Sequence, residues 1–320
     1  MGFLFDQMVS QKIGFLFPGQ GAQYVGMGSE WARQFESARG VFQEADHLLN
    51  FSLSKICFEG PEETLTRTLH AQPAIYVTSL AFLAVLTEKR GALKPDFVAG
   101  LSLGEFTALT AAGALSFTEG VKLVQARAQL MENSAREVQG TMISVLGLTQ
   151  EECQSIAKES GSQLANLNAS DQFVLSGRTA AIEKAAQLAE GMGAKRVIQL
   201  KVGGAFHSSL MNSAKEGFRE ALKKISIKKP SCVFVANASA EVEAEPEKIR
   251  TLLAEQLTSP VRWIETMERA HSHGIRRFIE IGPGRVLKGL AKRIDSTLEV
   301  FSLEKVADLE NLESVLERAQ

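Results

Sequence analysis

A serine held between two glycines most constrains what this chain can fold into. Residues 98–109 begin as a short apolar run, place Ser102 between Gly100 and Gly104, and continue at once as a helix-forming run. This pattern is typical of a nucleophile elbow, in which a strand turns sharply into a helix with serine at the tip. A side chain at either glycine would clash with the neighbouring strand or helix. The alternative is a glycine-rich turn that holds a serine without chemical consequence.

The surroundings of the elbow predict an oxyanion site. The N–H of Leu103 is expected to face the same cleft as the serine hydroxyl, and the helix N-terminus adds partial positive charge there. A second donor is predicted in the loop over residues 18–23, which follows a short apolar strand. Glycines on both sides of Gln20 let the main chain approach a ligand closely, so its N–H is the candidate. A tight loop that only makes a turn is the other interpretation.

Composition excludes several classes of function. The 320 residues carry a net charge of -2 and 45% hydrophobic residues, typical of a globular protein without bulk attraction for nucleic acid. No apolar run reaches the ~20 residues of a membrane span. The three cysteines are widely separated and lack metal-site spacing, which favours free thiols in the cytoplasm. Residues 1–12 are apolar but contain Asp6 and no basic start, so we interpret them as an N-terminal extension rather than a secretion signal.

The order of predicted elements indicates an α/β protein with an insertion. Residues 138–204 show the β-α-β-β-α-β order of a ferredoxin-like subdomain. The flanking segments, 13–137 and 205–320, alternate strands and helices as in a parallel sheet and form an α/β-hydrolase-like catalytic domain. Within them we expect a helix to begin with Pro73 at its first position and Gln72 just before it. A polar tail is expected after a last strand over 297–302.

Two further residues could act on the serine. His207 follows a Gly-Gly link and precedes small residues and a helix, whereas the other four histidines lie in polar contexts. It is the best candidate for a base. Asp171, the obvious acid between Ser102 and His207, lies in the turn of the small subdomain, so a carbonyl could orient the imidazole instead. Arg127 lies beside the apolar side of a helix, where it either reaches out to solvent or points inward to an anion.

Taken together, the motifs closely resemble those of the malonyl-CoA:acyl carrier protein transacylases. The segments that carry the resemblance are 19–23 (GQGAQ), 72–73 (QP), 100–105 (GLSLGE), Arg127, 166–168 (NLN), 205–207 (AFH), 256–257 (QL) with 260–261 (PV), and 282–284 (GPG). They occur in the family's order over about residues 13–303. The resemblance implies a ping-pong transfer of malonyl from coenzyme A to the phosphopantetheine thiol of acyl carrier protein in type II fatty-acid synthesis, without a tightly bound cofactor or a metal.

The resemblance also implies a role for individual residues. Ser102 would be the nucleophile and His207 its base, and the main-chain carbonyl of Gln256 would orient the histidine. Arg127 would pair with the malonyl carboxylate, to which a planar guanidinium is well matched. The remaining assignments are the N–H groups of Gln20 and Leu103 as the oxyanion hole, Gln72 as a supporting residue of the site, and Phe206 as a residue that narrows the pocket for malonyl.

The expected partner, acyl carrier protein, is acidic, so a basic docking surface is predicted. The candidates lie on the helix after the GPG turn: Arg285, Lys288, Lys292 and Arg293. A solvated helix face is the alternative. One position departs from the family pattern, because Leu101 stands where histidine is common.

The same motifs are compatible with three other functions. One is transfer of another acyl group such as methylmalonyl, a second is a serine thioesterase or hydrolase, and a third is a non-catalytic module that binds acyl carrier protein.

Overall fold

The computed structural model describes residues 12–91 and 93–317, so the predicted N-terminal extension lies outside the described residues except for Lys12. The larger of two sheets, sheet A, is parallel throughout, with strand order β7-β2-β1-β8-β9. Its strands are β1 (Ile13–Phe17), β2 (Phe97–Gly100), β7 (Val233–Phe234), β8 (Arg277–Ile281) and β9 (Glu299–Leu303). The predicted α/β class with a parallel sheet is confirmed.

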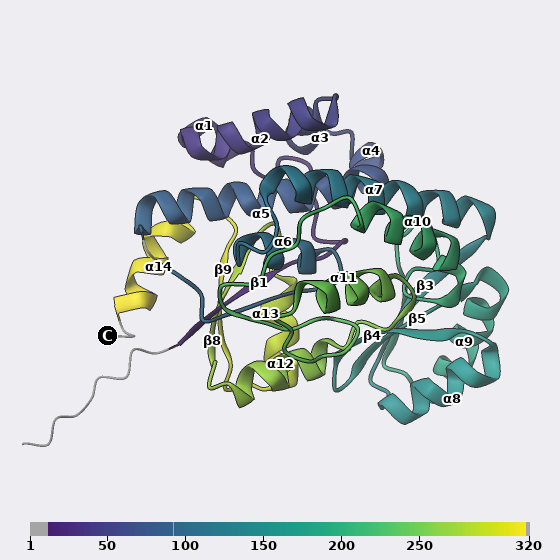
Figure 1. Ribbon diagram of the computed structural model, residues 1–320. Coiled ribbons are helices and arrows are strands. Elements are labelled where there is room, and N and C mark those ends of the chain that lie inside the picture. Colours follow the sequence, from purple (N-terminus) through teal and green to yellow (C-terminus); the bar gives the residue numbers. More distant parts are fainter. Residues whose placement is uncertain (1–11, 92, 318–320) are drawn as a thin grey trace, which may run out of the picture.

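Both faces of sheet A are covered by helices, as the apolar strands require (Figure 1). Phe15 and Phe17 of β1 contribute to the core under the first face, and Leu16 contributes to the core under the second. The first face carries α5 (Thr68–Arg90), α6 (Gly104–Ala111) and α7 (Phe117–Glu137), whereas the second carries α12 (Trp263–Ser272) and α13 (Val286–Ile294).

Shorter helices complete the large domain. Four of them lie on the outer side of α5: α1 (Ser29–Gln34), α2 (Glu36–Leu49), α3 (Leu53–Glu59) and α4 (Glu62–Thr66). The others are α10 (Asn212–Leu222), α11 (Pro246–Glu255) and α14 (Asp308–Glu317), with single 3-10 turns at Ser209–Met211 and Gln256–Thr258.

The smaller sheet, sheet B, is antiparallel and has the order β4-β5-β3-β6. It comprises β3 (Gly140–Leu146), β4 (Gln163–Ala169), β5 (Gln172–Arg178) and β6 (Arg196–Gln199), with α8 (Gln150–Ser160) and α9 (Thr179–Gly191) packed on one face. This is the predicted ferredoxin-like arrangement. Its boundaries at 138 and 204 stay a prediction.

Sheet B is fastened to the large domain along β4. The N–H of Leu167 donates to the carbonyl of Val261 at 2.9 Å, and the N–H of Val261 donates to the carbonyl of Ala165 at 2.8 Å. These two backbone bonds place Val261 beside Asn166 as a one-residue parallel bridge at the edge of β4. The face of sheet B opposite α8 and α9 is therefore held toward the carboxyl ends of the sheet A strands.

One local prediction was wrong, and one segment contains a helix that the sequence analysis did not predict. Helix α5 begins at Thr68, so Pro73 lies inside the helix rather than at its start. The missing N–H of Pro73 deprives one early carbonyl of its partner, and the burial of this helix on nearly every side outweighs that loss. The predicted polar tail contains helix α14, in which Leu312 is fully buried.

Among the described residues, α5 is the one helix long and apolar enough to cross a membrane. The apolar window of this helix is 78% buried inside the protein, where it serves as a core helix against α2 and α7.

Candidate active site

The elbow forms where β2 ends at Gly100 and α6 begins at Gly104. Ser102 between them has φ 51°, a left-handed conformation that is strained for a residue with a Cβ. A Cβ on Gly100 would overlap the backbone of Gly104, and one on Gly104 would overlap the carbonyl of Phe17. Both glycines are therefore required for the strand and helix to approach this closely.

Ser102 and His207 are in direct contact. The serine Oγ lies 2.8 Å from Nε2 of His207, and Nδ1 of His207 lies 2.8 Å from the main-chain carbonyl of Gln256. Because that carbonyl can only accept, Nδ1 carries the proton and Nε2 is left to accept from the serine hydroxyl. Burial, followed by the nearby charge of Arg127, lowers the pKa of His207 to about 4. The imidazole is therefore neutral at physiological pH and ready to take a proton.

Among the described residues, no carboxylate contacts the ring of His207. Asp171, the acid that the sequence offered, pairs instead with Arg293 at 3.4 Å on the surface of the protein. The main-chain carbonyl of Gln256, to which the resemblance gave the orienting role, is the group in contact with Nδ1. His207 itself has φ 56°, so both members of the Ser–His pair adopt left-handed backbone conformations.

Arg127 points inward and is 1% exposed, which decides between the two orientations left open by the sequence. Its Nη1 donates to Oε1 of Gln72 at 2.7 Å, and its Nη2 donates to Oε1 of Gln256 at 2.7 Å and to Oγ of Ser102 at 3.0 Å. Burial lowers the pKa of Arg127 to about 10, against the opposing effect of Glu105. The guanidinium thus remains a cation at neutral pH and touches the candidate nucleophile.

The two predicted oxyanion donors lie on either side of the elbow. Leu103 immediately precedes α6, and the loop with Gln20 packs so closely that a Cβ on Gly19 would overlap the carbonyl of Leu101. In the described part of the chain, neither the N–H of Leu103 nor that of Gln20 donates a hydrogen bond. Both groups are available to a ligand oxygen.

A cavity of about 230 Å³ lies beside Gln20 and the Ser102–His207 pair. The large domain contributes the candidate site residues Gln20, Gln72, Ser102, Arg127, Phe206 and His207 to its lining. Sheet B contributes the opposite wall with its uncovered face: Met142, Ser144, Asn166, Asn168, Gln172 and Val174. On that wall, Oγ of Ser144 and Oδ1 of Asn168 are buried and have no hydrogen-bond partner among the described residues, so they can receive a polar ligand.

Two buried polar residues of this site were missed by the sequence reasoning. Asn237 accepts the N–H of Ser102 at 2.7 Å and donates to the carbonyl of Gly100 at 2.8 Å, so it spans the elbow. Burial raises the pKa of Glu105 to about 7, although hydrogen bonds from Asn237 and Gln256 and the charge of Arg127 act in the other direction. The sequence feature that could have identified Asn237 is its position after the carboxyl end of a parallel strand, where α/β proteins place their ligand sites.

Leu101 has a packing role. It lies beside the core between sheet A and its second helical layer and also reaches the cavity lining. An apolar contact therefore occupies the position where the family resemblance led us to expect a histidine. Within residues 12–91 and 93–317, no cluster of three or more His, Cys, Asp or Glu side chains could hold a metal ion.

Residues 14–311 match the family model described as the acyl transferase domain. The chain belongs to the acyl transferase family. The malonyl CoA-acyl carrier protein transacylase of Bacillus subtilis (strain 168) is 43% identical over 311 residues, which cover 96% of each chain. The sequence-based resemblance to such transacylases is thereby confirmed.

Solved structures agree with this family. The acyl-carrier-protein-S-malonyltransferase of Bartonella henselae superposes with a TM-score of 0.91 at 38% identity, covering 96% of this chain and 99% of that one. A malonyl-transacylase in complex with its type II PKS acyl-carrier protein superposes with a TM-score of 0.90 at 36% identity, covering 96% and 99%.

Proposed function

We propose that this acyl transferase moves malonyl from malonyl-CoA to the phosphopantetheine thiol of acyl carrier protein, through an ester on Ser102. One observation carries the choice of acyl group: a fully buried guanidinium, that of Arg127, is hydrogen-bonded to the nucleophile itself. A buried cation is costly unless it meets an anion. A malonyl ester on Ser102 would bring its free carboxylate to this position, whereas an uncharged acyl group would leave the cation without an anionic ligand.

In the first half-reaction, Oγ of Ser102 attacks the thioester carbonyl while Nε2 of His207 takes the hydroxyl proton. Negative charge on the carbonyl oxygen is met by the free N–H groups of Gln20 and Leu103. When the tetrahedral intermediate collapses, His207 returns the proton to the departing sulfur of coenzyme A, and the serine ester remains.

The malonyl carboxylate then replaces the serine as a ligand of Arg127. An ester oxygen is a poorer acceptor than a hydroxyl, so the Nη2–H that pointed at Oγ becomes available. The side chains of Gln72 and Gln256 hold the plane of the guanidinium on two sides, which orients its fork toward the carboxylate. Phe206, 5% exposed and beside the base, narrows the space and favours malonyl over the branched methylmalonyl.

The second half-reaction reverses the first with a different thiol. The phosphopantetheine sulfur enters the cavity, gives its proton to His207 and attacks the ester carbonyl in the same oxyanion site. The bond from the carbonyl carbon to Oγ of Ser102 then breaks, and His207 returns the proton to Oγ. A thiol is intrinsically more nucleophilic than water, so a Ser–His pair without a carboxylate is sufficient for transfer. All steps use side chains and main-chain groups of this chain, and we propose that no tightly bound cofactor takes part.

Acyl carrier protein is proposed to dock beside α13, because Val286 and Leu290 of this helix line the cavity mouth. Lys288 and Lys292, one turn apart, are exposed and form no ion pair with a described residue. Of the other predicted contacts, Arg285 is paired with Glu304 and Asp308, and Arg293 with Asp171. The two lysines therefore carry the proposal. A relative of the same fold has been solved in complex with its acyl-carrier protein.

The deciding experiment is incubation of the full chain with malonyl-CoA, with and without holo acyl carrier protein. Transfer to the carrier is expected, with methylmalonyl-CoA as a poor competitor. Release of free malonate would indicate a hydrolase, and preferred use of methylmalonyl-CoA would overturn the assignment of Phe206. The Ser102→Ala variant should lose the malonyl adduct seen by intact mass spectrometry, and a persistent adduct would place the nucleophile elsewhere.

We further propose that the enzyme works in the cytoplasm. All three cysteines are free thiols, and Cys57 and Cys153 are buried. Free thiols are typical of a reducing compartment. Extraction of the native protein followed by thiol labelling should find all three reduced, whereas an intermolecular disulfide through Cys232 would contradict this assignment.

A further inference from the structure

A ring of hydrogen bonds lies under the elbow and is not accounted for by the transfer chemistry. The N–H of Ser102 donates to Oδ1 of Asn237 at 2.7 Å, and the N–H of Asn237 donates to Oε1 of Glu105 at 3.1 Å. Nε2 of Gln256 closes the ring, because it donates to Oε2 of Glu105 and to the carbonyl of Ser102 at 2.9 Å. Glu105, Asn237 and Gln256 are each at most 1% exposed. The strained peptide units of Ser102 are therefore held on both sides.

Each polar group of Asn237 takes part in a hydrogen bond. Its side chain bridges the elbow from the carbonyl of Gly100, at 2.8 Å, to the N–H of Ser102. Its main-chain N–H meets Glu105, and its carbonyl accepts the N–H of Arg262 at 3.1 Å. With four such bonds and no exposed surface, its conformation is fixed.

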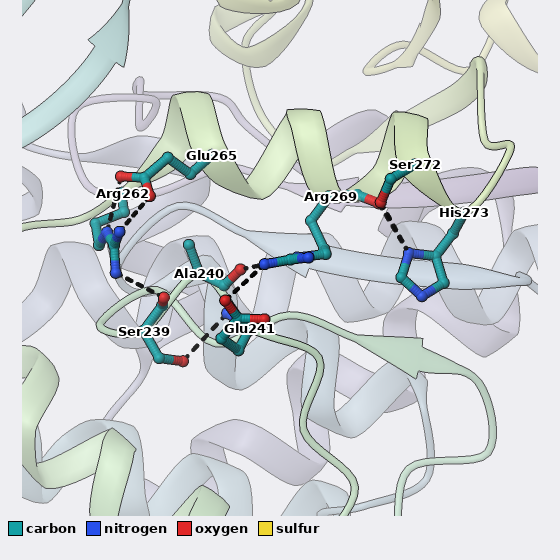
Figure 2. A network of polar contacts seen from close by, with 8 residues as sticks. All are labelled: Ser239, Ala240, Glu241, Arg262, Glu265, Arg269, Ser272 and His273. Carbon is teal, nitrogen blue, oxygen red and sulfur yellow. Dashed lines mark hydrogen bonds and ion pairs between the residues drawn. The ribbon is translucent and has the colours of Figure 1, made fainter.

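The loop that carries Asn237 is anchored from the opposite side by α12 (Figure 2). Arg262 donates to the carbonyl of Ser239 at 2.7 Å, and Arg269 donates to the carbonyl of Ala240 at 3.4 Å and pairs with Glu241 at 2.6 Å. Ala240 has φ 56°, so the loop is itself strained and depends on these contacts. Arg262, at the N-cap of α12, and Arg269 within the helix thus support the loop, and the loop supports the elbow.

We propose that Asn237 is a positioning residue of the transfer reaction. It fixes Ser102 in its left-handed conformation, which aligns Oγ with Nε2 of His207 and leaves the N–H of Leu103 free for the oxyanion. The inference rests on the proposed role of Ser102 as nucleophile, but not on the identity of the acyl group. Displacement of a reacting atom by about 1 Å can cost on the order of 100-fold in rate.

The test measures single-turnover acylation of Ser102 by malonyl-CoA, and separately its labelling by a fluorophosphonate, on Asn237→Ala and Asn237→Asp. The aspartate variant keeps the size of the side chain and its acceptor for the N–H of Ser102 but loses the donor to Gly100. We expect both rates to fall about 10- to 100-fold in the alanine variant and by less in the aspartate variant, with the concentration of malonyl-CoA at half-maximal rate unchanged. Glu241→Gln keeps an acceptor for Arg269 and leaves the arginine bonds to the carbonyls of Ser239 and Ala240 intact, so the loop stays anchored. It is the matched control and should label at the wild-type rate.

Rates are normalised to the folded fraction measured by circular dichroism. Wild-type rates in both Asn237 variants would overturn the inference, as would an equal loss in Glu241→Gln. If the wild-type chain reacts with the fluorophosphonate but not with malonyl-CoA, the proposed function fails, and the comparison of variants with the fluorophosphonate still decides the role of Asn237.

Discussion

Replacing Arg127 with alanine should separate malonyl from acetyl chemistry. In the acyl-enzyme, the guanidinium would make two charge-assisted hydrogen bonds to the malonyl carboxylate, at about 1.5–3 kcal/mol each. Part of this stabilisation is offset because Arg127 loses its hydrogen bond to Oγ of Ser102, which measures 3.0 Å in the free enzyme. A net loss of about 3 kcal/mol corresponds to roughly a 100-fold fall in the malonylation rate. Acetyl-CoA has no carboxylate, so its rate should stay equal or rise.

The substitution also has a structural cost. The side-chain oxygens of Gln72 and Gln256 each lose their partner in Arg127, and a buried unsatisfied acceptor costs about 1–3 kcal/mol. The free energy of unfolding should therefore decrease, although the removal of a buried cation makes this decrease smaller. The assay is rapid-quench acylation of folded enzyme followed by intact mass spectrometry. Arg136→Ala, on the exposed side of the same helix, is the control. An equal loss with both acyl-CoA substrates would refute the carboxylate role.

Three further predictions follow from the same geometry. Because the pKa of His207 is lowered to about 4, its neutral form predominates above that pH. A plot of kcat/KM against pH should therefore be level from pH 5 to 8 and fall only in more acidic solution. A fall centred near the ordinary pKa of histidine would contradict this. Reversing the charge of Lys288 and Lys292 should raise the apparent KM for acyl carrier protein and leave that for malonyl-CoA unchanged, and no change in either would reject the docking surface. In urea denaturation, Gly100→Ala should destabilise the protein by about 3 kcal/mol or more, because its Cβ overlaps backbone. Gly289→Ala, in open space on a helix, should instead stabilise it by roughly 1 kcal/mol. Similar effects of the two substitutions would show that the elbow tolerates a side chain.

The features that could be predicted from the sequence are those that depend on residues close together along the chain. The elbow is recognisable because its two glycines are sterically required within five residues of chain. The capping box of α8 is a local pattern of the same kind, because Thr149 and Glu152 are three residues apart and both of its hydrogen bonds form. The β-α-β-β-α-β order of sheet B likewise depends on periodicity within each segment.

The start of α5 could not be read in this way. Proline at a first helical position is a sound local rule, but the burial of the whole helix decided where it begins. A local preference is overridden when tertiary packing contributes more.

The residues that support the site from below could not be predicted from short stretches of sequence, for a different reason. Asn237 lies 135 positions from Ser102, and the side chain of Gln256 lies 129 positions from Arg127. The resemblance gave Gln256 a main-chain role only, and nothing local marks Asn237 as different from any other polar residue after a strand. These contacts exist because the parallel sheet brings the carboxyl ends of its strands to one edge.

The division of the cavity between two sheets has an evolutionary consequence. Every group that we propose to act on the acyl ester is carried by the large domain, whereas the opposite wall belongs to sheet B. Because sheet B is joined along β4 through backbone bonds to Val261, side chains on its cavity face can change without altering that junction. Selection can therefore reshape the chamber through residues such as Met142 and Val174 while the reactive groups stay in place. The insertion makes substrate range and reactivity separately adjustable within a single chain.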